Sequence, residues 1–147
     1  MPLWLSLVLI AAVIATMWWV KRPTQTPPPA ETNREIPKPT VIKPPELEQM
    51  LTEKPDDIFI LDVRGRKEYT KGQKLERALN VPVSFIMYRI KSIPRDKTIV
   101  TVCASGNRSL TGAAVLLMQD FPKVVSLEGG MNAWLAYKNM PRQPGCG

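Results

Sequence analysis

Residues 98–110 read TIVTVCASGNRSL, a β-branched apolar run that gives way to a short polar segment and then to an amphipathic pattern. The apolar run is typical of a strand that is buried on both faces, and Ser109 is expected to open a helix. Cys103 therefore lies at a predicted strand-to-helix turn. Backbone N–H groups pointing into such a turn and the positive end of the helix dipole both stabilise a negatively charged sulfur.

Arg108 follows Cys103 by five residues and adds a positive charge to the same segment. A helix N-terminus and a cation lower a cysteine pKa from about 8.5 to roughly 7 or below, which makes the thiolate abundant at neutral pH. An inert, buried thiol is the alternative for a cysteine after an apolar strand. Ser105, Gly106 and Asn107 favour the reactive thiol, because they suit a turn with unusual backbone angles rather than a packed core.

The composition argues against several kinds of active site. The chain has 147 residues, with 20 Lys and Arg against 13 Asp and Glu, a formal net charge of +7 and no histidine. Without histidine there is no Ser–His–Asp or Cys–His catalytic group, and two cysteines with scattered carboxylates are poor material for a metal site. The basic residues are spread without an aromatic platform or an RNA-reading motif, so no nucleic-acid partner is expected.

Residues 3–20 form an uncharged and almost wholly apolar run, LWLSLVLIAAVIATMWWV. Eighteen helical residues cover about 27 Å, close to the roughly 30 Å of a bilayer core, and tryptophans lie near both ends of the run. Leu3 to Val20 are therefore predicted to be a transmembrane helix. A cleaved secretory signal is the alternative, but the run has no positively charged segment before it and no small-residue cleavage site after it.

Basic residues directly after the apolar run predict its orientation. Lys21 and Arg22 follow the predicted span, and the positive-inside rule keeps such residues in the cytoplasm. We therefore expect a single-pass membrane protein whose folded domain faces the cytoplasm.

Prolines mark the segment that follows, because residues 22–45 contain eight of the fifteen prolines in the chain and show no apolar periodicity. Proline fixes φ and lacks an N–H, so such a segment favours an extended spacer over a fold. The predicted organisation is an anchor at residues 1–21, a Pro-rich tether at 22–39, a folded domain at 40–141 and a flexible tail at 142–147.

Apolar runs alternate with helical patterns within the predicted domain, which indicates an α/β fold. Strands are predicted at residues 40–42, 57–61 and 123–127, besides the one that begins at Thr98. Helices are predicted at residues 46–51, 84–91, 109–118 and 131–138. The buried positions expected on two of these helices are Phe85, Ile86, Ile90 and Ile93 for the second and Trp134 for the last.

Three motifs occur in the order Asp62-Val63-Arg64, Cys103-Ala-Ser-Gly-Asn-Arg108 and Leu127-Glu-Gly-Gly-Met-Asn-Ala-Trp134. Together they resemble the single-domain rhodanese family of sulfurtransferases over most of residues 40–141. The resemblance implies a three-layer α/β domain with a mainly parallel five-stranded sheet. It also implies that Cys103 is catalytic: it takes a sulfane sulfur from a donor such as thiosulfate, holds it as a covalent persulfide without a separate cofactor, and passes it to cyanide, a thiol or a carrier protein.

The resemblance also assigns roles around the cysteine. The loop is one residue shorter than in related phosphatases, which suits a sulfur atom rather than a phosphate. Asp62 and Arg64 are expected to support the loop through charge-assisted hydrogen bonds, with a solvated surface ion pair as the alternative. Arg108 is expected to position an anionic donor. The backbone N–H groups expected to hold the anionic sulfur belong to Ala104, Ser105, Gly106, Asn107, Arg108 and Ser109.

Two positions depart from the family pattern. Gln73 stands where a histidine usually follows Gly72, and Arg77 stands where a glycine usually precedes Ala78. Because arginine disfavours positive φ, we expect the turn at Arg77 to differ from the family's, or the surface there to be altered for a partner.

Two further alternatives concern function. A membrane-tethered sulfur-relay or redox-sensing module that acts on a protein partner is the second hypothesis, because a tether raises local concentration. A noncatalytic docking domain is a weaker hypothesis, since Cys103 and Arg108 are both present.

Cys146, near the end of the chain, is by default an inert exposed thiol, with a role in receiving sulfur from Cys103 as the alternative.

Overall fold

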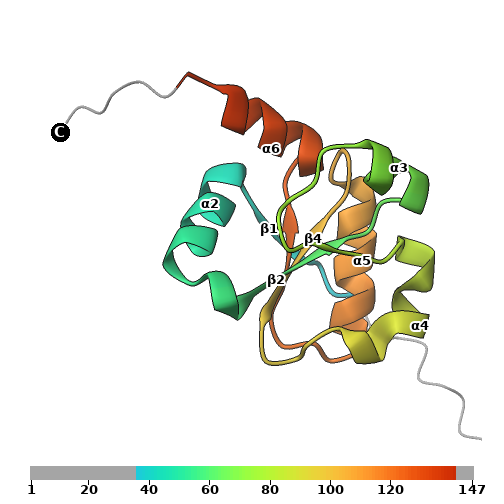
Figure 1. Ribbon diagram of the computed structural model, residues 1–147. Helices are drawn as coiled ribbons and strands as arrows, with labels where there is room; N and C mark the ends of the chain where they lie inside the picture. Colours follow the sequence, from blue (N-terminus) through green and yellow to red (C-terminus); the bar gives the residue numbers. More distant parts are fainter. Residues whose placement is uncertain (1–35, 142–147) are drawn as a thin grey trace, which may run out of the picture. The chain divides into compact units, whose positions relative to one another are not determined.

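The computed structural model of the chain describes residues 36–141, which form an open β-sheet with helices on both faces (Figure 1). The strand order is β1-β5-β4-β2-β3, and neighbouring strands are parallel throughout. This arrangement confirms the predicted five-stranded parallel sheet; the edge strand β3 had not been assigned from the sequence. The strands are β1 (Thr40–Ile42), β2 (Ile58–Asp62), β3 (Leu79–Asn80), β4 (Thr98–Val102) and β5 (Val124–Leu127).

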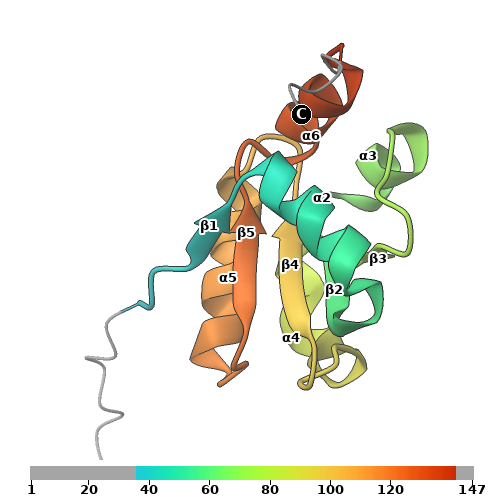
Figure 2. The same cartoon turned by 90° about the vertical axis from the view of Figure 1, so that its left-hand side faces the viewer.

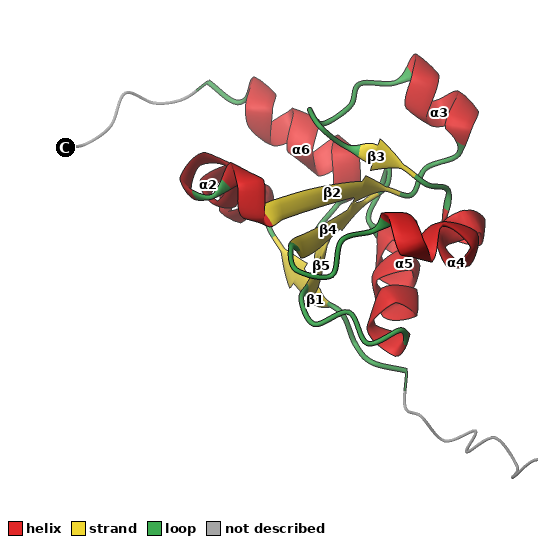
Figure 3. Ribbon diagram, turned by 60° about the horizontal axis from the view of Figure 1, so that its bottom comes forward, coloured by secondary structure: helices red, strands yellow, loops and turns green. Residues whose placement is uncertain are grey.

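Two helical layers enclose the sheet, as Figures 2 and 3 show from two further directions. The α4 and α5 side chains share one apolar core with the sheet, whereas α2 and α6 share the other. Three short 3-10 turns lie at Pro55–Asp57, Val83–Phe85 and Ile90–Ser92. The helices are α2 (Pro44–Glu53), α3 (Arg66–Lys71), α4 (Ile86–Arg89), α5 (Asn107–Met118) and α6 (Gly130–Asn139).

Strand β4 is buried on both faces, as its apolar run predicts. Ile99 packs into the core on the α5 side together with Cys103, whereas Val100 and Val102 pack into the core on the α6 side. Successive side chains of a strand point to opposite faces, so this alternation is the expected geometry. It places the Cys103 side chain on the face that α5 covers.

All five strands end at the same edge of the sheet because they are parallel. Asp62 ends β2, Cys103 directly follows β4, and the turn to α6 follows Leu127 at the end of β5. The carboxyl ends of parallel strands are where α/β folds place their sites. The three sequence motifs therefore meet at one edge although they are up to about seventy residues apart in the chain.

The segment predicted as one helix over residues 84–91 is instead α4 flanked by two 3-10 turns. Ile86 and Ile93 are buried as expected and Ile90 is partly buried, but Phe85 is 55% exposed, so that part of the prediction was wrong. Ile86 takes the inward position, and adjacent helical residues differ by roughly 100° around the axis. Phe85 consequently points away from the core.

The turn before β3 keeps a left-handed conformation despite its arginine. Arg77 has φ 59°, which corrects the expectation that arginine would change this geometry. A non-glycine residue in this region costs on the order of 1 kcal/mol. The ion pair of Arg77 with Asp56, at 3.2 Å, is largely exposed and offsets little of that cost.

The predicted anchor, most of the tether and the tail with Cys146 lie outside the described residues. None of the helices within residues 36–141 is long and apolar enough to cross a membrane.

Candidate active site

Cys103 begins a tight loop, here called the sulfur loop and defined as residues 103–109. Its thiol is fully buried. Gly106 has φ 97° and caps α5, which starts at Asn107, two residues before the predicted start. A positive φ turns the backbone back on itself, and the Gly106 N–H donates to Cys103 Sγ at 3.1 Å. Of the six amides predicted to hold the sulfur, that of Gly106 donates to it, and those of Ser105 and Ser109 act on its ionisation.

A buried network of hydroxyl groups surrounds the sulfur. The Cys103 thiol contacts Ser109 Oγ at 3.6 Å, and Ser109 in turn donates to the Gly106 carbonyl at 2.7 Å. Ser126 on β5 donates to Ser109 Oγ at 2.9 Å, while the Thr101 hydroxyl donates to the Ser109 carbonyl at 2.9 Å. Sequence reasoning missed Thr101 and Ser126. Period-two alternation along β4, which puts residues 101 and 103 on one face, was the signal for Thr101.

These contacts control the ionisation of the thiol. Burial alone raises the pKa of Cys103, but the Ser109 hydroxyl and the backbone N–H groups of Ser109, Gly106 and Ser105 oppose it, and the net effect lowers the pKa. Hydrogen bonds to a charged form favour that form. The thiolate is therefore stabilised mainly by neutral hydrogen-bond donors of the loop.

The turn between β5 and α6 fixes the other side of the loop. The Met131 N–H donates to the Cys103 carbonyl at 2.7 Å, and the Asn132 N–H donates to the Ala104 carbonyl at 3.0 Å. Gly130 has φ 58°, and a Cβ there would lie 2.3 Å from the Cys103 carbonyl oxygen. The first turn of α6 thus binds the outward carbonyls of the loop and leaves its amides to face the sulfur.

Arg108 is bound by a carboxylate that the sequence did not reveal. Its two terminal nitrogens donate to the two carboxylate oxygens of Glu68 on α3, each at 2.9 Å. This contact is the main cause of a lowered pKa of Glu68 and a raised pKa of Arg108. Arg108 also interacts electrostatically with Cys103. The predicted cation is present, but the end of its guanidinium that carries the two terminal nitrogens is occupied by Glu68.

Asp62 and Arg64 form a buried ion pair with each other. Arg64 Nη2 lies 2.7 Å from Asp62 Oδ2, and the same nitrogen donates to the Gln73 carbonyl at 2.9 Å. In the described part of the chain neither side chain is hydrogen-bonded to residues 103–109, so the expected charge-assisted hydrogen bonds to the sulfur loop are absent there, although Asp62 interacts electrostatically with Arg108. The pair instead ties the end of β2 to the segment after α3, the helix that carries Glu68.

The remaining predicted loop residues form its rim. Ser105 and Asn107 are exposed, and Ala104 is partly buried. A hollow of about 260 Å³ borders Ser105 and Asn107 on the β5 side, with Gly106, Glu128 and Gly129 among its other lining residues.

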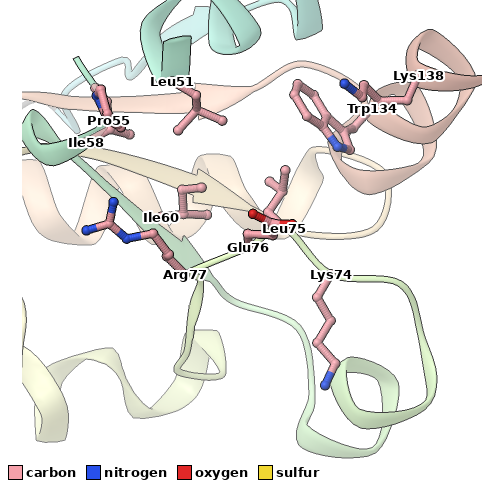
Figure 4. Close-up of a pocket in the computed structure, with 10 residues that line it drawn as sticks. All are labelled: Leu51, Pro55, Ile58, Ile60, Lys74, Leu75, Glu76, Arg77, Trp134 and Lys138. Atoms are coloured by element: carbon pink, nitrogen blue, oxygen red, sulfur yellow. The ribbon is translucent and has the colours of Figure 1, made fainter. Parts of the chain in front are cut away.

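A larger hollow of about 530 Å³ lies on the α2 and α6 face of the sheet, away from the sulfur loop (Figure 4). Figure 4 shows Trp134 and Lys138 at one end of it and Arg77 at the other. None of its lining residues belongs to residues 103–109. Although it is the larger of the two hollows, it is therefore not a candidate site for the chemistry of Cys103. Its apolar lining comprises Leu51, Pro55, Ile58, Ile60, Leu75 and Trp134.

Known proteins are similar to this chain in sequence and in fold. A sulfurtransferase of Allochromatium vinosum is 35% identical over 79 residues, which cover 54% of this chain and 73% of that protein. A thiosulfate sulfurtransferase of Pseudomonas fluorescens is 33% identical over 91 residues, covering 62% and 81%. The crystal structure of a rhodanese-related protein from Thermoplasma volcanium matches with a TM-score of 0.58 at 28% identity, covering 69% and 95%.

The family model of the rhodanese-like domain matches residues 43–137. That range contains strands β2 to β5; only β1 lies before it. It also contains the complete sulfur loop, Glu68 and the α6 turn that supports the loop. The chain therefore belongs to the rhodanese-like domain family.

Proposed function

We propose that the protein is a sulfurtransferase that carries a sulfane sulfur as a persulfide on Cys103. The observation that carries this proposal is the geometry of the sulfur itself: a thiol with a lowered pKa receives the Gly106 N–H at 3.1 Å inside a closed loop. Low pKa makes the thiolate available as a nucleophile, and the same donors suit a negatively charged persulfide.

The reaction consists of two displacements. The Cys103 thiolate attacks the outer sulfur of thiosulfate, a new S–S bond forms, and sulfite leaves with the electron pair of the broken S–S bond. The terminal persulfide sulfur then passes to a nucleophilic acceptor such as cyanide or a thiol, and the thiolate is regenerated. Neither step requires a cofactor or a metal, since the sulfur is held covalently.

The acceptor and the location are part of the proposal. Residues 3–20 would anchor the chain in a membrane with the domain in the cytoplasm, where a tethered domain would meet a membrane-bound partner at raised local concentration. This favours a protein acceptor as the second candidate, in which the module relays sulfur or senses redox state. Nucleic acid has no part in either version.

Intact mass of the full chain after incubation with thiosulfate tests the proposal. The native chain should gain one sulfur atom that a reductant removes, and Cys103→Ser should gain none. Cys146→Ser is the matched control and should load like the native chain, because the loop is unchanged. The cell fraction that yields the chain tests the anchor in the same experiment: recovery in the soluble fraction would contradict it.

Absence of loading with thiosulfate and with methanethiosulfonate would overturn the enzymatic proposal and favour a docking module. If loading succeeds but cyanide and small thiols accept the sulfur slowly, the relay becomes the better description.

A further inference from the structure

We infer that Glu68 determines which sulfur donors the site accepts: by occupying Arg108 it disfavours a dianionic donor such as thiosulfate relative to donors of lower charge. The inference rests on the proposed function, since it concerns the donor of the same Cys103 reaction. It assigns to α3, which lies outside the sulfur loop, the control of donor specificity.

The first support is that Glu68 occupies the end of the Arg108 guanidinium that its two terminal nitrogens form. Both terminal nitrogens of the guanidinium are engaged at 2.9 Å by the two oxygens of one carboxylate. This two-point geometry is the one by which arginine binds carboxylates and other oxyanions. A sulfonate group that sought the same two-point contact would therefore have to displace Glu68.

The second support is that Glu68 is held in position. Arg64 binds the Gln73 carbonyl directly after α3, and the Tyr69 hydroxyl donates to the Ala78 carbonyl at 2.9 Å. Both contacts fix the short helix that carries Glu68. The carboxylate thus acts as a resident anion rather than as a freely rotating surface group.

The third support is accessibility. The Arg108 side chain is 42% exposed and the Glu68 side chain 38% exposed, so a small anion can compete for the guanidinium. A partly exposed pair of this kind is worth little free energy, which makes the competition reversible. The effect on donors should consequently be graded rather than absolute.

The charge balance gives the direction of the effect. The attacking group is a thiolate, and thiosulfate brings two further negative charges; of the three, sulfite leaves with two and the persulfide keeps one. With Glu68 ionised, the ion pair contributes no net positive charge to this anionic assembly. Methanethiosulfonate reacts in the same way, with a methanesulfinate leaving group, but brings one negative charge fewer, so Glu68 should hinder it less.

The test is Glu68→Gln in the full chain, with steady-state sulfur transfer to cyanide from each donor. We expect kcat/KM for thiosulfate to rise about three- to tenfold, mainly through KM, and kcat/KM for methanethiosulfonate to rise less than half as much. The ratio of the two values removes any common change in thiolate content, because both donors react with the same thiolate.

Two variants complete the design. Glu53→Gln removes the same charge at the end of α2, before β2 begins and thus near the opposite edge of the sheet, and should leave the ratio unchanged. Glu68→Asp keeps the charge but shortens the side chain, so its ratio should lie between those of the native chain and Glu68→Gln. Far-ultraviolet circular dichroism checks that each variant is folded. If Glu68→Gln does not fold, the donor ratio of Glu68→Asp is compared with that of the native chain instead.

An unchanged donor ratio in Glu68→Gln, or the same change in Glu53→Gln, would overturn the inference. Either result differs from failure of the proposed function, in which Cys103 takes up no sulfur from either donor in the native chain.

Discussion

Cys103 has a reactive environment although no cationic side chain contacts its sulfur within the described residues. Its lowered pKa depends on Ser109 and on loop amides, and Arg108 is paired with Glu68. The Ser109 hydroxyl accepts from the thiol and from Ser126, while its one hydrogen is donated to the Gly106 carbonyl; when the thiol ionises, that hydrogen can turn to the thiolate instead. One serine therefore fits both ionisation states of the sulfur.

Ser109→Ala should make the thiol less acidic. The variant keeps Cys103 buried but loses the side-chain hydrogen bond that lowers the pKa of its thiol. Burial, which raises this pKa, is then opposed only by the backbone N–H groups, so the pKa rises. At neutral pH the rate of alkylation by iodoacetamide should fall about tenfold, since a hydrogen bond to a charged group contributes roughly 1.5 kcal/mol or more. The whole rate profile should shift to higher pH.

Ser105→Ala is the control for this experiment, because the Ser105 side chain is exposed at the loop rim. Its alkylation profile should match that of the native chain. An identical profile for Ser109→Ala would show that the backbone amides alone determine the thiol pKa.

Sequence reasoning at the residue scale succeeded where chemistry is local and failed where it depends on distant contacts. Cys103, Gly106 and Ser109 lie close together in the chain, and their pattern predicted a turn whose groups contact the Cys103 sulfur, as Gly106 and Ser109 do. Glu68 is forty residues from Arg108. No local pattern distinguishes it from other exposed acidic residues, and only the fold brings it to the loop.

At the scale of elements, the turn from β5 to α6 supports the loop more directly than the Asp62 and Arg64 pair does. The first N–H groups of α6 have no partners within the helix, and two of them bind carbonyls of the sulfur loop. Close approach of the two backbones is possible because Gly130, and Gly106 on the loop side, carry no side chain: a Cβ at Gly130 would lie 2.3 Å from the Cys103 carbonyl oxygen, and one at Gly106 would lie 3.1 Å from the Gly129 nitrogen. Glycine is therefore required in this turn because the sulfur loop packs against it, and not only because the turn needs a flexible backbone.

Gly130→Ala should damage both the loop and the fold. The added Cβ would lie 2.3 Å from the Cys103 carbonyl oxygen and 2.8 Å from the Ala104 carbonyl carbon, in a residue with positive φ. We expect the free energy of unfolding in urea to fall by more than about 2 kcal/mol, and sulfur loading measured by intact mass to be lost.

Gly65→Ala is the matched control, because a Cβ at Gly65 meets no atom within 4 Å and its φ is −59°. Its stability should change by less than about 0.5 kcal/mol and its loading should be normal. Normal loading in Gly130→Ala would mean that the contact with α6 is not required for the sulfur site.

At the scale of the whole molecule, the α/β class and most strands were predictable because apolar runs and helical periods are properties of the sequence. The order β1-β5-β4-β2-β3 arises from pairings between distant segments, which periodicity does not encode. Arg77 shows the same limit: its positive φ is imposed by the turn into β3 against the preference of the residue itself. Local preference predicted the reverse and was overridden by the surrounding structure.

The two apolar layers share one sheet, which should make the domain unfold as a single unit. Leu116 on α5 and Leu127 on β5 are both fully buried, and they lie in different layers. Leu116→Ala and Leu127→Ala should each lower the free energy of unfolding by about 2–5 kcal/mol, and urea unfolding followed by circular dichroism should remain one transition. The control Leu110→Ala, on the exposed side of α5, should change stability by less than about 0.5 kcal/mol.

Hydrogen exchange follows the two layers separately. If Leu116→Ala increased the exchange of α5 amides while α6 amides kept their native protection, the layers would be independent. The sulfur loop between them could then open without global unfolding.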